Sequence, residues 1–165
     1  MLEATKKLID GINAIPGLRV LGQPAMCMFS FASDEINVYQ LADELNKRGW
    51  YLQGQFSTPF TPRSLHISVN YGTSHNVDAL LKDLRECVEI VKHSTPIDSE
   101  AIRAMVGAAL QSPDPEAAFA QLAQSAGLAG TDLPTEMAFI NEVLDALPDS
   151  LCNLFLVNYF NDLYV

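Results

Sequence analysis

Basic residues are scarce in this chain. Its 165 residues include 10 Lys and Arg against 20 Asp and Glu, a formal net charge of -10. Nucleic acids and anionic membrane surfaces are bound through basic side chains, so neither is an expected partner. The shortage is uneven, because residues 1–95 hold nine basic and ten acidic side chains, whereas residues 96–165 hold only Arg103 against ten acidic ones. This shift predicts two domains, 1–95 and 96–165.

The chain also lacks long apolar runs and clustered cysteines. Its most apolar run, Leu151 to Val157, is too short to span a bilayer, and Met1 to Gly11 is a charged amphipathic segment rather than a secretory signal. Cys27, Cys87 and Cys152 lie far apart with no CxxC pair, so we expect reduced thiols. No His/Cys spacing typical of a metal site occurs. These absences predict a cytoplasmic protein with no metal.

Helical and strand-like patterns alternate through the first 95 residues. Apolar residues recur at helical spacing in three segments, residues 2–15, 38–49 and 77–91. Strands are predicted at 18–21, 25–31, 50–52 and 65–69, with a loop over 53–64, which contains Gly54, Pro59 and Pro62. The order predicts an α+β fold (a two-layer α/β arrangement), with a small, mostly antiparallel sheet carrying helices on one face.

After Pro96 the pattern is helical. Asp98 is a suitable N-cap for a helix with Ile102, Val106 and Leu110 on its apolar face. Further helices are predicted after Ser112-Pro113-Asp114 and after Pro134, followed by an apolar tail from Leu151 to Leu163. We therefore expect an acidic α-helical C-terminal extension packed on the first domain.

Five short segments stand out in the first 95 residues: IPGLRVLGQP at 15–24, FAS at 31–33, LADELNKRGW at 41–50, SLHISV at 64–69 and LLKDLREC at 80–87. In this order they resemble the small C-terminal domain of sphingosine-phosphate-lyase-like enzymes, which depend on pyridoxal phosphate and are related to the group II decarboxylases. AGLAG at 126–130 and NDLYV at 161–165 fit more loosely. Each segment is weak alone, and their order and spacing carry the resemblance.

The resemblance implies a fold type I enzyme that works as a homodimer and cleaves a carbon–carbon bond with pyridoxal phosphate. Such an enzyme needs a Schiff-base lysine in a large domain, and the family's lysine usually follows a histidine. Here His66, His75 and His93 precede Ile, Asn and Ser. Because the chain starts where the small domain would start, we expect a fragment or C-terminal domain with no catalytic residue, no cofactor-binding residue and no activity alone.

Four residues are expected near the substrate entrance of the parent enzyme. Gln55 and Phe56 are placed there by the resemblance alone. Arg63 could bind a carboxylate or phosphate, and His66 lies on the polar side of a predicted strand. The ordinary alternatives are a surface arginine and a histidine bonded to neighbouring backbone.

Two alternatives to a lyase domain remain open at this stage. The same domain is similar to that of amino-acid decarboxylases, and a stand-alone ferredoxin-like binding domain would also fit the predicted elements. A large domain on a separate polypeptide is a further possibility. Exposed apolar residues at Met26, Met28, Phe29 or 151–164 would then form the docking face.

Overall fold

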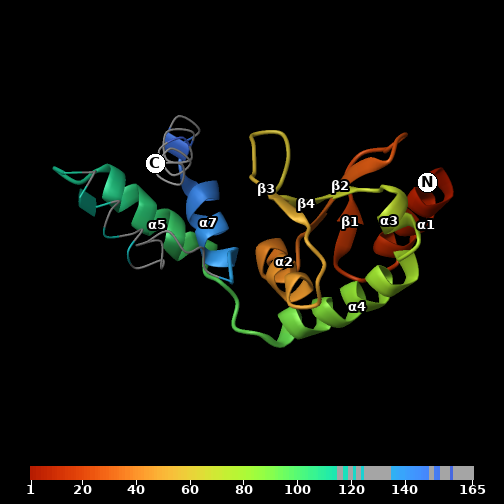
Figure 1. Cartoon of the computed structure of the whole chain (residues 1–165). Coiled ribbons are helices and arrows are strands. Elements are labelled where there is room, and N and C mark those ends of the chain that lie inside the picture. Colours follow the sequence, from red (N-terminus) through yellow and green to blue (C-terminus); the bar gives the residue numbers. More distant parts are fainter. Residues whose placement is uncertain are drawn as a thin grey trace, which may run out of the picture. The chain divides into compact units, whose positions relative to one another are not determined.

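The computed structural model describes residues 1–114, 117–118, 121, 124, 135–148, 151–152 and 157. The chain forms two compact units, Met1–Pro96 (unit 1) and Ile97–Val165 (unit 2), which are described separately. Figure 1 shows the sheet and its helices in unit 1 and a helical unit 2. Most of the predicted helix after Ser112-Pro113-Asp114, the segment at 126–130 and most of the tail lie outside the described residues.

Unit 1 is built on a four-stranded antiparallel sheet. Its strands are β1 (Leu18–Val20), β2 (Met28–Ser33), β3 (Gln53–Gln55) and β4 (Ser64–Ser68), and their order across the sheet is β1-β2-β4-β3. From Met28 to Phe31 and from Leu65 to Ser68 the two central strands alternate between buried and more exposed side chains, and Phe29, Phe31, Leu65 and Ile67 point into the core. Ala32 and Ser64, on the other face, are buried as well. This alternation is typical of a sheet with one face covered by helices.

Three helices supply the rest of the core on that covered face (Figure 1): α1 (Leu2–Asn13), α2 (Val38–Asn46) and α4 (Val77–His93). Each helix places an apolar stripe inward, represented by Leu8, Leu41 and Leu84, all at most 1% exposed. A short helix, α3 (Tyr71–Ser74), precedes α4. The predicted α+β class, with a small antiparallel sheet and helices on one face, is confirmed.

Local signals explain where α2 begins and ends. The Asn37 side chain accepts hydrogen bonds from the backbone N–H groups of Tyr39 and Gln40, as the predicted N-cap should. At the other end Gly49 has φ of +85°, which suits a residue without a Cβ. The sequence therefore fixes both ends of this helix locally.

Polar contacts connect the end of α2 to α4. The Trp50 indole donates a hydrogen bond to Asp83 Oδ2 at 2.7 Å, and Arg48 Nη1 lies 3.0 Å from Asp83 Oδ1 and 2.6 Å from Glu86 Oε2. The hydrogen bond from Trp50, and then that from Arg48, lower the pKa of the Asp83 carboxyl. Burial raises the pKa of the neighbouring Cys87 thiol.

One strand prediction was wrong, and the limits of another were shifted. The third strand is Gln53–Gln55, within the predicted loop, instead of residues 50–52. The second strand is Met28–Ser33, which shares residues 28–31 with the predicted 25–31. The Trp50 side chain is hydrogen-bonded to Asp83 on α4, and the strand begins only three residues later, at Gln53. Residues 22–26 join β1 to β2 without pairing. The flanking backbone hydrogen bonds run from Leu21 N to Ser30 O and from Val69 N to Cys27 O. Phe29 faces the core and cannot belong to an exposed docking face.

The described residues of unit 2 include the helices α5 (Ser99–Leu110) and α7 (Ala138–Ala146). The Asp98 side chain caps α5 by accepting from the N–H groups of Glu100 and Ala101, as predicted. Ile102, Val106 and Val143 form a small apolar cluster between the two helices. Across the described ranges, no helix is long and apolar enough to cross a membrane, and no group of three metal-binding side chains comes together.

Candidate functional site

The face of the sheet opposite the helices is the main candidate surface of unit 1. Side chains that are directly opposite in an antiparallel ladder share a face. The register pairs His66 with Ser30 on one side and with Gln53 on the other, and it pairs Met28 with Ser68. The residues on this face are therefore Arg19, Met28, Ser30, Ala32, Gln53, Gln55, Ser64, His66 and Ser68.

This face is polar but almost free of charge. Arg19 at the edge strand is its one formally charged side chain, while Gln53, Ser68 and Met28 are exposed and Ser30, Gln55 and His66 are half-buried. The solvent side of α4 is different, since most of its exposed residues are Asp, Glu, Lys or Arg. The open face therefore offers neutral hydrogen-bonding groups around one exposed methionine.

The sheet brings two of the four predicted site residues onto this face. His66 Nε2 lies 3.1 Å from Ser68 Oγ, two positions along β4. Gln55 lies on β3 opposite Ser64, and its backbone carbonyl accepts a hydrogen bond of 3.1 Å from the buried Tyr39 hydroxyl. That bond fixes the edge strand to α2, so the Gln55 side chain is held on a rigid element.

Phe56 and Arg63 lie in the loop between β3 and β4, both half-buried. The tip of this loop is held by its own hydrogen bonds. Thr58 N donates to Thr61 O at 2.8 Å, and Thr58 Oγ1 accepts from the N–H groups of Phe60 and Thr61. This ordered turn leaves Phe60 94% exposed.

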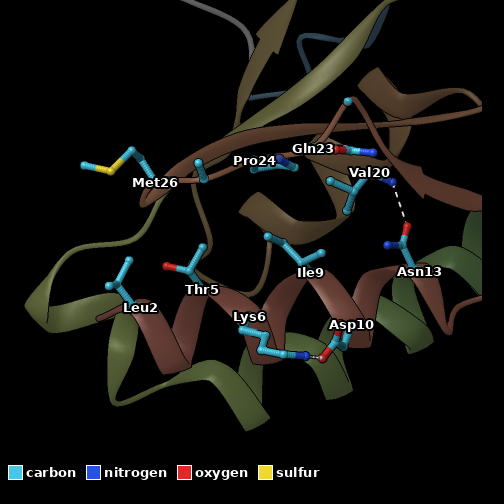
Figure 2. A pocket seen from close by; sticks show the side chains of 12 residues that line it. Leu2, Thr5, Lys6, Ile9, Asp10, Asn13, Val20, Gln23, Pro24 and Met26 are labelled. Carbon is cyan, nitrogen blue, oxygen red and sulfur yellow. Dashed lines mark hydrogen bonds and ion pairs between the residues drawn. The ribbon is translucent and has the colours of Figure 1, made fainter.

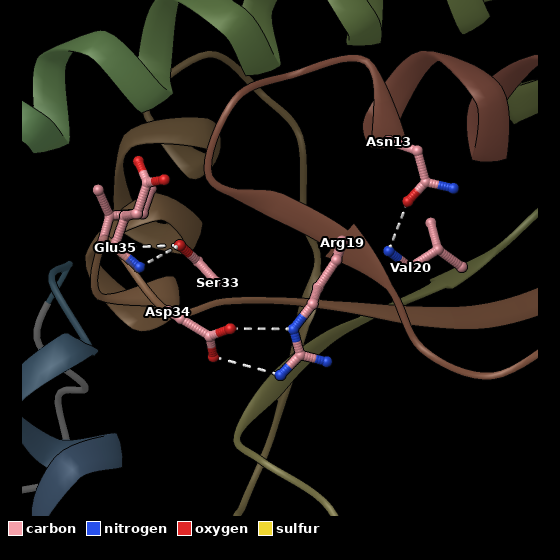
Figure 3. Close-up of polar contacts among 7 residues, drawn as sticks. Asn13, Arg19, Val20, Ser33, Asp34 and Glu35 are labelled. Carbon is pink, nitrogen blue, oxygen red and sulfur yellow. Dashed lines mark hydrogen bonds and ion pairs between the residues drawn. The ribbon is translucent and has the colours of Figure 1, made fainter.

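At the β1 edge a bidentate ion pair anchors the one charged side chain of the open face (Figure 3). Arg19 Nε and Nη2 donate to the two carboxylate oxygens of Asp34 at 3.1 and 3.2 Å. The hydrogen bond raises the pKa of Arg19 and lowers that of Asp34. Beside this pair, the Asn13 side chain accepts from Val20 N at 2.8 Å and so covers the outer edge of β1.

A cavity of about 480 Å³ lies between α1 and the segment that joins β1 to β2 (Figure 2). Leu2, Ile9 and Val20 give it apolar walls. Three of its polar groups bond to neighbours, since Lys6 Nζ lies 2.6 Å from Asp10 Oδ2 and the Thr5 hydroxyl donates to Met1 O. Gln23 also lines the cavity.

The lysines do not fit a cofactor aldehyde. A Schiff-base lysine needs an amine that is neutral and held in a pocket. All five lysines of the chain lie instead in ion pairs with carboxylates on the surface of unit 1: Lys6 with Asp10, Lys7 with Asp78, Lys47 with Glu44, Lys82 with Glu86, and Lys92 with Glu89 and Glu35. No step of pyridoxal chemistry can be assigned to these residues.

Sequence patterns did not reveal Gln53, Ser30 and Phe60 as parts of the candidate surface. The alternation in Leu65–Val69 places His66 and Ser68 on a polar side, but it does not say which strands lie beside them. Only the β2–β4 and β3–β4 registers bring Ser30 and Gln53 to His66. Phe60 lies in a loop, where no helical or strand periodicity of the sequence could indicate whether its side chain is exposed.

Comparison with known proteins gives the chain a family context. Residues 99–162 match a family model described as the C-terminal putative HTH domain of pyridoxal-dependent enzymes. The chain is 34% identical over 114 residues to a sphingosine-1-phosphate lyase of Oryza sativa subsp. japonica, and 32% identical over 114 residues to that of Arabidopsis thaliana. Each match covers 69% of this chain and 20% of the lyase.

A solved structure agrees with these relatives. The sphingosine-1-phosphate lyase of Burkholderia pseudomallei matches with a TM-score of 0.50 and 28% identity, over 67% of this chain and 24% of that one. The chain thus spans about a fifth of the length of the plant lyases that it matches. In sequence and in fold, it is homologous to the C-terminal region of the sphingosine-1-phosphate lyases, a group of pyridoxal-dependent enzymes.

Proposed function

We propose that this chain serves as the C-terminal domain of a pyridoxal-phosphate-dependent carbon–carbon lyase that acts on a phosphorylated long-chain amino alcohol. The observation that carries the proposal is the match over 69% of the chain to only 20% of a lyase. The remaining four-fifths of such an enzyme would supply the lysine, the partner of the pyridine nitrogen and the phosphate site. This chain would contribute Gln55, Phe56, Arg63 and His66 near the substrate entrance.

Alone, the chain should neither bind pyridoxal phosphate covalently nor turn over substrate. The ion-paired lysines support this expectation, because a protonated amine that is held by a carboxylate is a poor nucleophile. The chain should also act in the parent as part of a cytoplasmic homodimer. In the same proposal, residues 1–95 form the small domain and residues 96–165 its helical extension.

A chimera tests the proposal. The full chain would replace the matched C-terminal part of the Burkholderia pseudomallei lyase, and cofactor absorbance and cleavage of sphingosine 1-phosphate would be measured. We expect a folded chimera that holds pyridoxal phosphate and cleaves the substrate, while the chain alone shows no covalent adduct after borohydride reduction. A stoichiometric adduct on one lysine of the chain alone would overturn the proposal. Activity on amino acids with release of carbon dioxide would favour the decarboxylase alternative.

The helical unit 2 should not bind DNA, although the matching family model carries the description of a putative HTH domain. A DNA-binding helix pair needs a basic face, and residues 96–165 hold only Arg103 against ten acidic side chains. Fluorescence anisotropy with a labelled duplex at low salt should show no binding. Binding that weakens steeply with added salt would contradict this expectation.

A further inference from the structure

A groove runs along α1 in unit 1. It is the cavity of about 480 Å³ between this helix and the segment from Val20 to Met26. Figure 2 shows Leu2 and Met26 at one end of the groove and Asn13 and Val20 at the other, where Val20 N donates to Asn13 Oδ1. Leu2 and Asn13 are the first and last residues of α1, so the groove is about 16 Å long. Its volume lies in the range of about 300–1,000 Å³ that is typical of small-molecule sites.

The apolar part of this groove is open to solvent. Leu2 and Met26, at one end, are 64% and 68% exposed. Ile9 on the helix side, and Pro24 and Ala25 on the opposite side, continue the apolar wall. Apolar side chains that are exposed together, rather than singly, mark a surface from which a ligand gains free energy by displacing water. A narrow hydrocarbon chain laid along α1 would cover these residues and would need no hydrogen-bond partner there.

The polar groups of the groove are one cation, one anion and two amides. Lys6 Nζ lies 2.6 Å from Asp10 Oδ2, and both side chains are exposed. An exposed ion pair of this kind contributes little to stability, so both groups are able to take ligand partners. Asn13 uses its Oδ1 for Val20 N, and within the described part of the chain the Gln23 side chain forms no hydrogen bond. The N–H groups of both amides are therefore available to a ligand.

Charge selects the class of ligand. An anion that pairs with Lys6 meets the adjacent Asp10 carboxylate, and a cation that pairs with Asp10 meets the Lys6 ammonium. A head group that carries both charges pairs with both side chains, and phosphate oxygens also accept hydrogen bonds from amide N–H groups. We infer that the groove along α1 binds a single-chain zwitterionic amphiphile whose head group carries a phosphate and a primary ammonium. Its phosphate pairs with Lys6, its ammonium with Asp10, and its chain covers the apolar wall.

The inference goes beyond the proposed function. The groove is formed by residues 2–26 and contains none of the four residues expected near the substrate entrance. A phosphorylated long-chain amino alcohol belongs to the ligand class that the groove selects. Only the statement that this ligand is the substrate or a relative of it rests on the proposed function. On that basis the groove is a second place where the enzyme holds its amphiphile, separate from the cofactor.

The binding experiment uses the free full chain and dodecylphosphoethanolamine below the concentration at which it forms micelles. Amide shifts in NMR spectra should change saturably, and the changes should be confined to residues 2–13 and 20–26. Phosphoethanolamine, which lacks the chain, and dodecyl maltoside, which has an uncharged head group, are the comparison compounds. Each should bind at least about tenfold more weakly, because each loses one of the two kinds of contact.

Two matched pairs of variants locate the site. Met26→Glu places a carboxylate in the apolar part of the groove, whereas Met28→Glu places one at a similarly exposed position outside it. Lys6→Gln removes the cation of the groove, whereas Lys82→Gln removes one from an exposed i,i+4 pair with Glu86 on α4. Met26→Glu and Lys6→Gln should each weaken binding at least about fivefold. Met28→Glu and Lys82→Gln should leave it unchanged, and circular dichroism checks that all four variants fold.

The outcomes that overturn the inference are distinct. They are no saturable binding of dodecylphosphoethanolamine, equal effects of Met26→Glu and Met28→Glu, or binding of dodecyl maltoside as tight as that of the zwitterion. Binding only to micelles or to phosphatidylcholine vesicles would mean a lipid surface instead of a single molecule. A dimer in sedimentation that Met26→Glu dissociates would mean that a second copy occupies the groove. A chimera that holds no cofactor overturns the proposed function and leaves the groove and its ligand class standing.

Discussion

Substituting alanine for Gly11 should destabilise unit 1, although alanine is normally the better residue in a helix. Gly11 lies within α1, where this helix packs on α4. A Cβ at this position would lie 2.5 and 2.7 Å from the two methyl groups of Leu81 and 3.1 Å from its Cγ. Carbon atoms normally approach to about 3.5–4.0 Å, so the whole branch of Leu81 would have to move by about 1 Å.

The sign of the effect depends on two opposing terms. Replacing a helical glycine by alanine gains about 1 kcal/mol of helix propensity. Overpacking a buried contact costs about 1–3 kcal/mol, and Leu81 is only 4% exposed, so its branch cannot swing into solvent. Taking about 2 kcal/mol for the overpacking, the net loss of unfolding free energy is about 1 kcal/mol.

Gly107 provides the matched control. It lies in α5, and a Cβ there would meet nothing within 4 Å. Gly107→Ala should therefore stabilise its helix by about 1 kcal/mol, the propensity gain alone. The same chemical change should thus have opposite signs at the two positions.

Two assays read these effects separately. Urea unfolding followed by fluorescence of Trp50, the single tryptophan of the chain, reports on unit 1, and amide hydrogen exchange of α5 reports on Gly107→Ala. In the Gly11→Ala, Leu81→Ala double variant, the new methyl group fills part of the vacated space, so the double loss should be smaller than the sum of the single losses. A Gly11→Ala variant as stabilised as Gly107→Ala would refute the packing argument.

Three further predictions concern local signals in unit 1. Asn37→Ala should lower the unfolding free energy by about 1 kcal/mol in urea titrations, because two N–H groups of α2 lose their acceptor; an unchanged midpoint would contradict the cap. Gly49→Ala should lower the unfolding free energy by about 1–2 kcal/mol, since φ is +85° there. Gly22→Ala, at a second positive φ, should have an effect of the same sign. The lowered pKa of Asp83 predicts stabilisation that is present above the ordinary carboxyl pKa of 3.8 and lost as pH falls through the lower folded value. Trp50→Phe should therefore flatten this acid dependence, measured by circular dichroism, and an unaltered acid limb would exclude the indole as its cause.

Local patterns predicted the secondary structure best where one short signal decides it. Asn37, Asp98 and the apolar stripe of α4 correctly indicated two helix starts and the longest helix of unit 1. Strand limits failed where a tertiary contact competes. Trp50 resembles a strand residue by type, but its hydrogen bond to Asp83 on α4 holds it outside β3. The short helix α3, built on the Asn70 cap, was not predicted, because four residues give no periodic pattern.

The candidate surface shows the same division. The alternation around His66 predicts a polar strand face, but only the ladder brings Ser30 and Gln53 to it from segments far apart in sequence. Gln55 was expected in a loop and instead lies in the edge strand, with its carbonyl bound by Tyr39. Arg63 and Phe56 remain loop residues, and their proposed closeness to substrate awaits the chimera.

The sequence by itself determined the α+β class, the helix caps and the likeness to a lyase C-terminal domain, because these depend on local periodicity and on the order of short segments. The tertiary structure alone decided that Lys7 of α1 pairs with Asp78 of α4 and that one sheet face is neutral and free of helices within unit 1. The physical reason is that helix packing and strand register join residues distant in sequence, whereas the pairs of Lys6, Lys47 and Lys82 lie within one helical turn. No local pattern encodes which of two faces the helices will cover.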